Sequence, residues 1–233
     1  MIELKRIECI AFDADDTLWH NETLFTETQK KFKSLLLEYH SEEWVDQKLY
    51  ETEMRNLQHF GYGVKGFTLS MIETAVELSE GRIGGSEISQ IISFAKEMLS
   101  SPVELLDGIA DTIGKLSETH RLMIITKGDL FDQESKIARS GIGELFEHVE
   151  VVPRKTTDIY EKILSRQNLL PEKFMMVGNS LKSDVFPVSE IGGNAVHVPY
   201  ETTWAHEDAG EDEIKKHKFI RLEHIRKLLD LFS

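Results

Sequence analysis

The sequence predicts an α/β fold in which a helical insert interrupts a parallel sheet just after its first strand. Short apolar runs that end abruptly at polar residues occur near the start of the chain, and they alternate with helix-spaced segments beyond about residue 102. Between about residues 18 and 101 the strand-like runs disappear and apolar residues recur at helical spacing. A parallel sheet flanked by helices, joined to a separate helical domain, accounts for both patterns.

Six short runs carry the strand pattern. Each is dominated by apolar residues, as expected of strands that are buried on both faces. The first run ends at Asp13, the second at Thr126 and the fourth at Gly178. The six expected strands are Ile7–Phe12, Leu122–Ile125, Val149–Val152, Phe174–Val177, Ala195–Val198 and Phe219–Leu222, and helix-spaced residues such as Ile109, Ile113, Leu116, Ile159, Ile163 and Leu164 lie between them.

Four helices are expected in the insert. Their apolar stripes fit a bundle core better than a cofactor site, and three glycines between the second and third stripes predict a loop over Gly61–Phe67. We therefore assign residues 1–17 and 102–233 to an α/β core and residues 18–101 to a four-helix domain. The stripes consist of Leu24, Thr28, Phe32, Leu35, Leu36 and Tyr39, then Trp44, Val45, Leu49 and Leu57, then Leu69, Ile72 and Val76, and finally Ile88, Ile91, Ile92, Ala95 and Leu99.

The composition is that of a folded, acidic protein. Among 233 residues, 41 are Asp or Glu and 27 are Lys or Arg, which gives a net charge of -14 and a pI near 5.1. This charge disfavours nucleic acid and anionic membrane surfaces as partners. No apolar run approaches the ~18 residues of a membrane helix, and charges interrupt the N-terminus before a signal peptide forms, so a cytoplasmic protein is expected. Cys9 is the single cysteine, which excludes a disulfide framework, and the His206–Glu207 pair is not expected to bind zinc.

Two carboxylates follow the first strand directly. Side chains two residues apart on an extended backbone point to the same side, so Asp13 and Asp15 are expected to face one cavity at the carboxyl end of that strand. Ligands of open α/β sheets bind at this edge. Neighbouring carboxylates repel each other unless a cation or a shared proton offsets their charge, which favours a functional pair. A strand-to-turn junction with two ordinary turn aspartates fits this segment alone equally well.

Three later stretches shift the balance toward a functional site. Thr126, then Lys155, then Gly178–Asp184 come at or after strand ends, in this order along the chain. Together with Asp13–Thr17 they resemble the four motifs of the haloacid dehalogenase-like hydrolase superfamily, over a core from about residue 7 to residue 199. The resemblance implies a Rossmann-like (HAD-like) parallel sheet core flanked by helices, with an inserted four-helix cap domain.

The resemblance also implies roles for individual residues. It implies phosphoryl transfer through an aspartyl-phosphate, in which Asp13 attacks phosphorus and Asp15 acts first as general acid and then as general base. Lys155 would place a positive charge beside the nucleophile, and Thr126 would bind a phosphoryl oxygen together with the backbone amide of Lys127. A solvated surface lysine and a strand-ending threonine are the structural alternatives at these two positions.

Magnesium is the cofactor that the resemblance implies. Its preference for oxygen ligands suits Asp13, the backbone carbonyl of Asp15 and the last motif, where Asn179 and Asp184 are the expected contacts. Many relatives place an aspartate where this chain has Asn179, so we expect weaker metal binding here. Asp184 would then serve the outer shell of the metal or hold Lys155 by an ion pair.

Three further residues are candidates for substrate binding. Thr17 lies in the first motif, although a turn residue or a helix N-cap has the same pattern. The glycine-rich stretch Gly61–Phe67 is placed like the substrate-specificity loop of the superfamily, which would bring Tyr62 and Lys65 over the catalytic carboxylates. An ordinary glycine-rich turn with an exposed lysine is the alternative.

These observations predict a magnesium-dependent phosphatase that hydrolyses small phosphorylated metabolites. A phosphomutase uses the same pair of carboxylates and is not distinguished from it. A 2-haloacid dehalogenase is disfavoured, because such members of the superfamily lack an acid at the position of Asp15. The neutral Asn179 leaves open a binding protein that retains the fold without turnover. The natural substrate and the choice between monomer and homodimer are not predicted.

Overall fold

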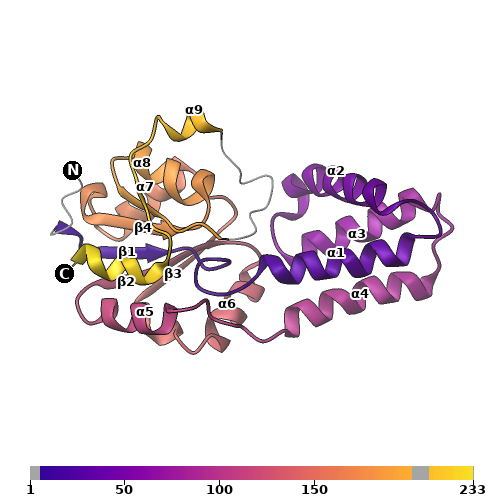
Figure 1. Cartoon of the computed structure of the whole chain (residues 1–233), viewed down its shortest axis with the longest axis horizontal. Helices are drawn as coiled ribbons and strands as arrows, with labels where there is room; N and C mark the ends of the chain where they lie inside the picture. The colour runs from indigo at the N-terminus through magenta and orange to yellow at the C-terminus, as the bar shows by residue number, and fades with distance from the viewer. Residues whose placement is uncertain (1–5, 201–209, 233) are drawn as a thin grey trace. The chain divides into compact units, whose positions relative to one another are not determined.

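The computed structural model describes residues 6–200 and 210–232, and the chain divides into two compact units (Figure 1). The sequence-based expectation for His206–Glu207 lies outside the described residues. Each unit has its own hydrophobic core. The first unit comprises Met1–Glu22, Val103–Lys127 and Glu134–Ser233, and the second comprises Thr23–Pro102 and Gly128–Gln133.

The first unit is built on a parallel sheet of six strands in the order β3-β2-β1-β4-β5-β6. All six expected strands are confirmed, with ends that differ from the expected ones by at most two residues. The order places the first strand of the chain near the middle of the sheet. The strands are β1 (Cys9–Phe12), β2 (Arg121–Lys127), β3 (His148–Val152), β4 (Phe174–Gly178), β5 (Asn194–His197) and β6 (Ile220–Arg221).

Alternate residues of β1 enter different core layers. Ile10 and Phe12 pack into the layer that contains α5 (Ile109–Ser117), whereas Cys9 and Ala11 pack into the layer that contains α7 (Thr157–Arg166) and α8 (Phe186–Glu190). Figure 1 shows these helices on the two sides of the sheet. Because both faces are covered, the strand is apolar throughout. The remaining helical segments of this part of the chain are α6 (Leu130–Arg139), α9 (Glu211–Ile214), the 3-10 turns η2 (Gly143–Leu145), η3 (Pro171–Lys173) and η6 (Ile225–Phe232), and the π-helical turn η4 (Leu181–Val185).

The direction of the strand order reverses at β1. Phe12 pairs with Ile124 of β2 on one side and with Val177 of β4 on the other. The backbone N–H of Asp13 then donates to the Val177 carbonyl at 2.9 Å. Asp13 and the residues that follow β4 therefore meet at a topological switch point, where open α/β sheets bind their ligands.

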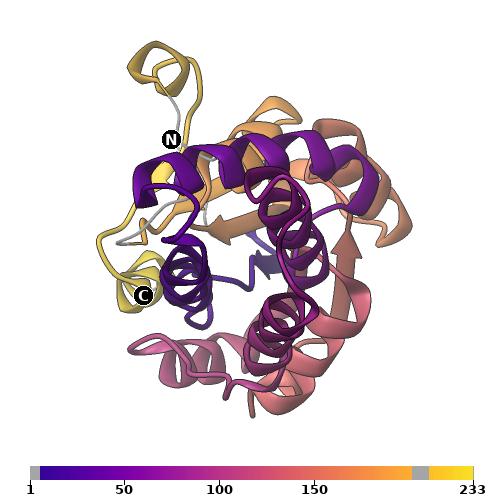
Figure 2. The same cartoon turned by 90° about the vertical axis from the view of Figure 1, so that its right-hand side faces the viewer.

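The second unit contains the four helices that the insert was expected to form. Fully buried residues from each of them, including Phe32, Leu49, Met71 and Ile91, make up its core. Figures 1 and 2 show α3 running alongside both α2 and α4. The helices are α1 (Glu22–Leu36), α2 (Glu42–Phe60), α3 (Val64–Leu78) and α4 (Gly85–Ser100).

The buried face of α3 differs from the expected one. Leu69 and Val76, two members of the expected stripe, are 43% and 44% exposed. The buried residues are instead Val64, Phe67, Met71, Ala75 and Leu78. Both sets have helical spacing, because this helix is apolar on more than one face, so spacing alone could not select the side that packs against α2 and α4.

The glycine-rich loop is also shorter than predicted. Helix α2 ends at Phe60 and α3 begins at Val64, so only three residues connect them and Lys65 lies in the first turn of α3. Gly61 and Gly63 have positive φ angles of 70° and 108°. Gly66 is helical, and a Cβ atom there would lie 2.7 Å from the Gly61 carbonyl oxygen. This glycine therefore permits a close backbone approach rather than a loop.

The helical unit includes a segment that the sequence did not assign to it. Gly128–Gln133, which follows β2 and contains the start of α6, groups with the helices of the insert. Asp129 in this segment accepts hydrogen bonds from Lys65 of α3 at 2.9 and 3.0 Å. None of the helices in the described residues has the length and apolar content that crossing a lipid bilayer requires.

Candidate active site

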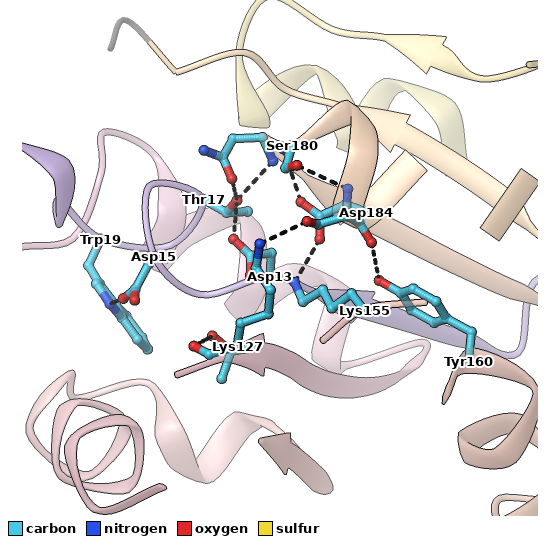
Figure 3. A network of polar contacts seen from close by, with 12 residues as sticks. Asp13, Asp15, Thr17, Trp19, Lys127, Lys155, Tyr160, Ser180 and Asp184 are labelled. Atoms are coloured by element: carbon cyan, nitrogen blue, oxygen red, sulfur yellow. Dashed lines mark hydrogen bonds and ion pairs between the residues drawn. The ribbon is translucent and has the colours of Figure 1, made fainter. Parts of the chain in front are cut away.

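A buried lysine joins two carboxylates at the carboxyl edge of the sheet (Figure 3). The Lys155 ammonium lies 2.5 Å from Oδ1 of Asp13 and 2.6 Å from Oδ1 of Asp184. The three residues are 4%, 7% and 1% exposed, respectively. Buried charges of one sign are costly without a partner of the other sign, and here each carboxylate has one.

Burial and charge act in opposite directions on these groups. Burial raises the pKa of Asp13 to about 6, an effect that Lys155 opposes and Asp184 reinforces. Burial alone would lower the pKa of Lys155, but the two carboxylates beside it outweigh this effect and raise the pKa. Lys155 therefore carries its positive charge at neutral pH, and it favours the ionised form of Asp13 that a nucleophile requires.

Thr17 connects the segment after β1 with the segment after β4. Its Oγ1 lies 3.2 Å from Oδ2 of Asp13 and 3.2 Å from Oδ1 of Asn179, and it accepts the backbone N–H of Asn179 at 3.1 Å. A hydroxyl has one proton, so it donates to one of the two oxygens at a time. A tight turn at Asp16, whose φ is 59°, brings Thr17 back toward the sheet.

The turn after β4 fixes the carboxylate of Asp184. Oδ2 of this residue accepts the backbone N–H of Ser180 at 3.0 Å, and the hydroxyl of Ser180 accepts the N–H of Ser183 at 3.0 Å. A Cβ atom at Gly178 would lie 2.1 Å from Oδ2 of Asp184. The glycine is thus required for the carboxylate to lie against the end of β4.

Two residues from other elements contact the same turn. The ammonium of Lys127, at the end of β2, donates to Oγ of Ser183 at 2.8 Å, and the hydroxyl of Tyr160 from α7 donates to the Ser183 carbonyl at 3.0 Å. The sequence-based expectation used only the backbone amide of Lys127. Thr126 is buried beside it, with its hydroxyl 3.3 Å from the Lys127 carbonyl.

Asp15 is held by partners other than those of Asp13. Its Oδ1 and Oδ2 accept hydrogen bonds from the Lys136 ammonium at 2.7 and 2.9 Å, and the indole N–H of Trp19 donates to Oδ1 at 2.8 Å. Figure 3 shows Asp15 turned to Trp19, and Asp13 turned to Lys155. The alternation of side chains holds only while the backbone is extended, and β1 ends at Phe12.

Side-chain hydrogen bonds and ion pairs thus connect six of the ten predicted site residues around Lys155, in part through Ser180 and Ser183, and the other four have different surroundings. Tyr62 lies in the turn between α2 and α3, and Lys65 binds Asp129; both belong to the helical unit. Asp15 forms an ion pair with Lys136, and Thr126 is buried at the end of β2. The six are Asp13, Thr17, Lys127, Lys155, Asn179 and Asp184.

Sequence reasoning missed three residues that support this site. Lys136 and Tyr160 lie on helices whose sequence shows only amphipathic spacing, and no signal marks them as partners of Asp15 and Ser183. His197 lies at the end of β5, where its Nε2 is 3.0 Å from the Asn179 carbonyl. Burial lowers the pKa of His197, so the neutral ring donates to that carbonyl. Its position at a strand end was a usable signal.

Oxygen donors of the kind that binds magnesium lie at this edge of the sheet. Asp13, Asn179 and Asp184 offer carboxylate and amide oxygens, which Mg²⁺ prefers, and it keeps several waters of its own. Within residues 6–200 and 210–232, no group of three or more His, Cys, Asp or Glu side chains is arranged to hold a metal. A metal here would therefore depend on the Asn179 amide, backbone carbonyls and water in addition to carboxylates.

Comparison with known proteins identifies one family for this chain. The chain matches the haloacid dehalogenase-like hydrolase family over residues 7–187. A haloacid dehalogenase-like hydrolase from Xanthomonas campestris is 37% identical, with a TM-score of 0.85 over 97% of this chain and 92% of that chain. A predicted phosphoglycolate phosphatase from Haemophilus somnus is 17% identical, with a TM-score of 0.66 over 98% of this chain and 99% of that chain, and shares the fold.

Curated relatives match over shorter stretches. A glyceraldehyde 3-phosphate phosphatase from Methanothermobacter thermautotrophicus is 33% identical over 97 residues, which are 40% of this chain and 43% of that protein. Its namesake from Pyrococcus furiosus is 35% identical over 82 residues, 33% of this chain and 34% of that protein. The matched stretches span less than half the length of these relatives.

Proposed function

The chain belongs to the haloacid dehalogenase-like hydrolase family, and from this premise we propose that it is a magnesium-dependent phosphatase of small phosphorylated metabolites. The observation that carries the proposal is the buried arrangement of Asp13, Lys155 and Asp184, with a second acid, Asp15, two residues after the first. A carboxylate at a switch point, paired with a buried ammonium, is suited to attack an anionic phosphoryl group.

In the first step Asp13 is the nucleophile. One of its carboxylate oxygens forms a bond to phosphorus, the bond between phosphorus and the ester oxygen breaks, and the departing oxygen takes a proton from Asp15. Lys155 offsets the negative charge that the substrate adds beside Asp13. Thr126, together with the backbone amide of Lys127, binds a phosphoryl oxygen. The products of this step are an aspartyl-phosphate and the free alcohol.

In the second step water attacks the phosphorus of the aspartyl-phosphate. Asp15, now ionised, takes a proton from the water, and the bond between phosphorus and the Asp13 oxygen breaks to release inorganic phosphate. Each residue returns to its starting state. Asp13, Asn179, Asp184 and the backbone carbonyl of Asp15 would hold Mg²⁺, which would supply positive charge that lets two anions approach.

We assign the helical unit as a cap domain that selects the substrate. The helical unit comprises Thr23–Pro102 and Gly128–Gln133, whereas the limits expected from the sequence are residues 18–101. Tyr62 and Lys65 are the candidates for contacting the part of the substrate beyond the phosphate. Lys65→Ala should change the relative kcat/KM values within a panel of phosphorylated metabolites; an unchanged ranking would indicate that the Lys65 pair with Asp129 only tethers the turn.

Phosphate esters are favoured over the other substrates of this fold. The curated relatives are named phosphatases, and Asp15 supplies the acid that a poor leaving group needs. A phosphomutase would use the same residues and is distinguished by its product, an isomeric sugar phosphate in place of inorganic phosphate. A dehalogenase has no use for a general acid at Asp15.

The direct test is release of inorganic phosphate from 4-nitrophenyl phosphate and from a metabolite panel, with Mg²⁺ and with a chelator. We expect Mg²⁺-dependent release, and we expect Asp13→Asn to lower kcat by more than ~10³-fold, the scale of nucleophile removal. Asp111→Asn, at an exposed position of α5, is the matched control and should retain activity. Absence of turnover with every metal, with no effect of Asp13→Asn, would indicate a binding protein.

A further inference from the structure

The two expected catalytic carboxylates of the first motif, Asp13 and Asp15, are paired with two different lysines. Asp13 binds Lys155, whereas Asp15 binds Lys136 through both of its oxygens, at 2.7 and 2.9 Å. Lys136 comes from α6, which belongs to none of the four motifs, and its side chain is only 12% exposed. The pair is therefore partly shielded from water, where a charge-assisted hydrogen bond is stronger than on the open surface.

The surroundings fix the geometry of this pair. The Trp19 indole N–H donates to Oδ1 of Asp15, and Lys136 also donates to the Asn21 side-chain carbonyl at 3.3 Å. Trp19 is 1% exposed, so its ring cannot move without disturbing the core of the first unit. The Asp15 carboxylate consequently has donors on both oxygens from two sides, which restricts its rotation.

From this geometry we infer that Lys136 is a positioning residue for Asp15. It holds the acid and base of the reaction in one orientation and gives it a cation of its own. The inference rests on the proposed function, because it assigns Lys136 a part in the proton transfer that Asp15 performs there. Lys136 does not touch the reacting atoms; it acts through the Asp15 carboxylate.

Asp15 requires a lysine other than Lys155, because Lys155 is already engaged. Two carboxylates only two residues apart would compete for one ammonium, and Lys155 already binds Asp13 and Asp184. Without Lys136, the Asp15 carboxylate would lose both of its ionic contacts with that side chain, which restrict its rotation. A rotated carboxylate would no longer face the leaving oxygen.

The test combines two substrates and two positions. We expect Lys136→Met to lower kcat for an alkyl phosphate by about 10- to 100-fold, part of the ~10²–10⁴-fold that general acid catalysis contributes, with KM nearly unchanged. The loss should be smaller for 4-nitrophenyl phosphate, whose leaving group needs little protonation. Lys136→Arg, which can donate to both oxygens, should recover part of the activity. In an Asp15→Asn background, Lys136→Met should have no further effect.

Arg139→Met is the matched control, since it removes an exposed cation from the same helix. Equal losses on both substrates, or a full Lys136→Met effect in the Asp15→Asn background, would overturn the inference while leaving the phosphatase proposal standing. A crystal structure of Lys136→Met provides a readout that does not depend on turnover. The Asp15 carboxylate should leave the place it occupies beside Trp19, and an unchanged carboxylate would contradict the inference.

Discussion

Gly178 shows how tightly the residues of the site are packed. A Cβ atom there would lie 2.1 Å from Oδ2 of Asp184, so Gly178→Ala must displace the carboxylate that binds Lys155. We expect a loss of about 1–3 kcal/mol in the free energy of unfolding, the usual cost of overpacking. Urea unfolding followed by circular dichroism measures it.

The same substitution elsewhere supplies the control. Gly114 lies within α5 with no atom near the position of an added Cβ, so Gly114→Ala should instead stabilise the protein by roughly 0.5–1 kcal/mol. Opposite signs for the two variants would support the steric account. Equal effects would mean that Asp184 can move away from β4 at little cost.

Asn179 sets the charge of the proposed metal site. Its Oδ1 lies beside Thr17, in the same network as Asp13, and replacing the amide by a carboxylate adds one negative charge there. We expect Asn179→Asp to tighten Mg²⁺ binding by roughly tenfold, about 1.4 kcal/mol, because ligand charge tunes affinity. Isothermal titration calorimetry with Mg²⁺ measures this change directly.

A control for charge alone is Asn168→Asp, which makes the same change at an exposed position with a φ of 52°. It should leave the Mg²⁺ affinity unaltered. If Asn179→Asp behaves like this control, then Asn179 does not contact the metal, and the assignment of the last motif to the metal site is wrong.

At the scale of elements, the start of α1 is built around acidic side chains. The Asp16 carboxylate accepts the backbone N–H groups of Asn21 and Glu22 at 2.9 to 3.1 Å, which satisfies donors that a helix N-terminus leaves unpaired. Burial raises the pKa of Asp16 to about 7 despite these bonds. Burial also raises the pKa of Glu22 from 4.5 to about 7, and the nearby Asp16 charge adds to this effect.

These values predict a stability that falls as the pH rises. The folded protein binds the Glu22 proton more tightly than the unfolded chain, so the stabilisation is complete below about pH 4.5 and is lost as the pH passes 7. Glu22→Gln should therefore flatten the decrease in unfolding temperature between pH 5 and pH 8, a range chosen around these values. Glu27→Gln, at an exposed position of the same helix, is the control, and equal pH profiles for the two variants would refute the role of Glu22.

The elements also show where sequence patterns are sufficient and where they are not. Strands buried on both faces are apolar throughout, so all six were predicted within two residues. The buried face of α3 was predicted incorrectly, because Leu69 and Val76 have the same helical spacing as the residues that pack in the core of the helical unit. Gly66 was wrongly assigned to a loop. A glycine is needed there because a Cβ atom would lie 2.7 Å from the Gly61 carbonyl oxygen, and this close approach cannot be read from the sequence.

For the molecule as a whole, the limit of sequence reasoning is the pairing of distant segments. Residues at or after strand ends meet at one edge of a parallel sheet, and the resemblance of their order to the four family motifs is how Asp13, Lys155 and Asp184 were identified. Lys136 could not be identified in this way, since it lies within a helix rather than after a strand, and that helix has no unusual pattern. The grouping of Gly128–Gln133 with the helical unit likewise depends on contacts such as Lys65 with Asp129.

Because the chain has a net charge of -14, Mg²⁺ can change its stability by acting on carboxylates throughout the molecule as well as at the proposed site. A divalent ion that binds only the folded state stabilises it by about 2.7 kcal/mol at 100 times its Kd. We expect Mg²⁺ to raise the unfolding temperature more than NaCl of equal ionic strength, which only screens repulsion between carboxylates. Asp13→Asn should reduce the response to that of NaCl. If the variant responds to Mg²⁺ like the natural sequence, the ion stabilises the protein at other carboxylates, and the site beside Lys155 does not bind it.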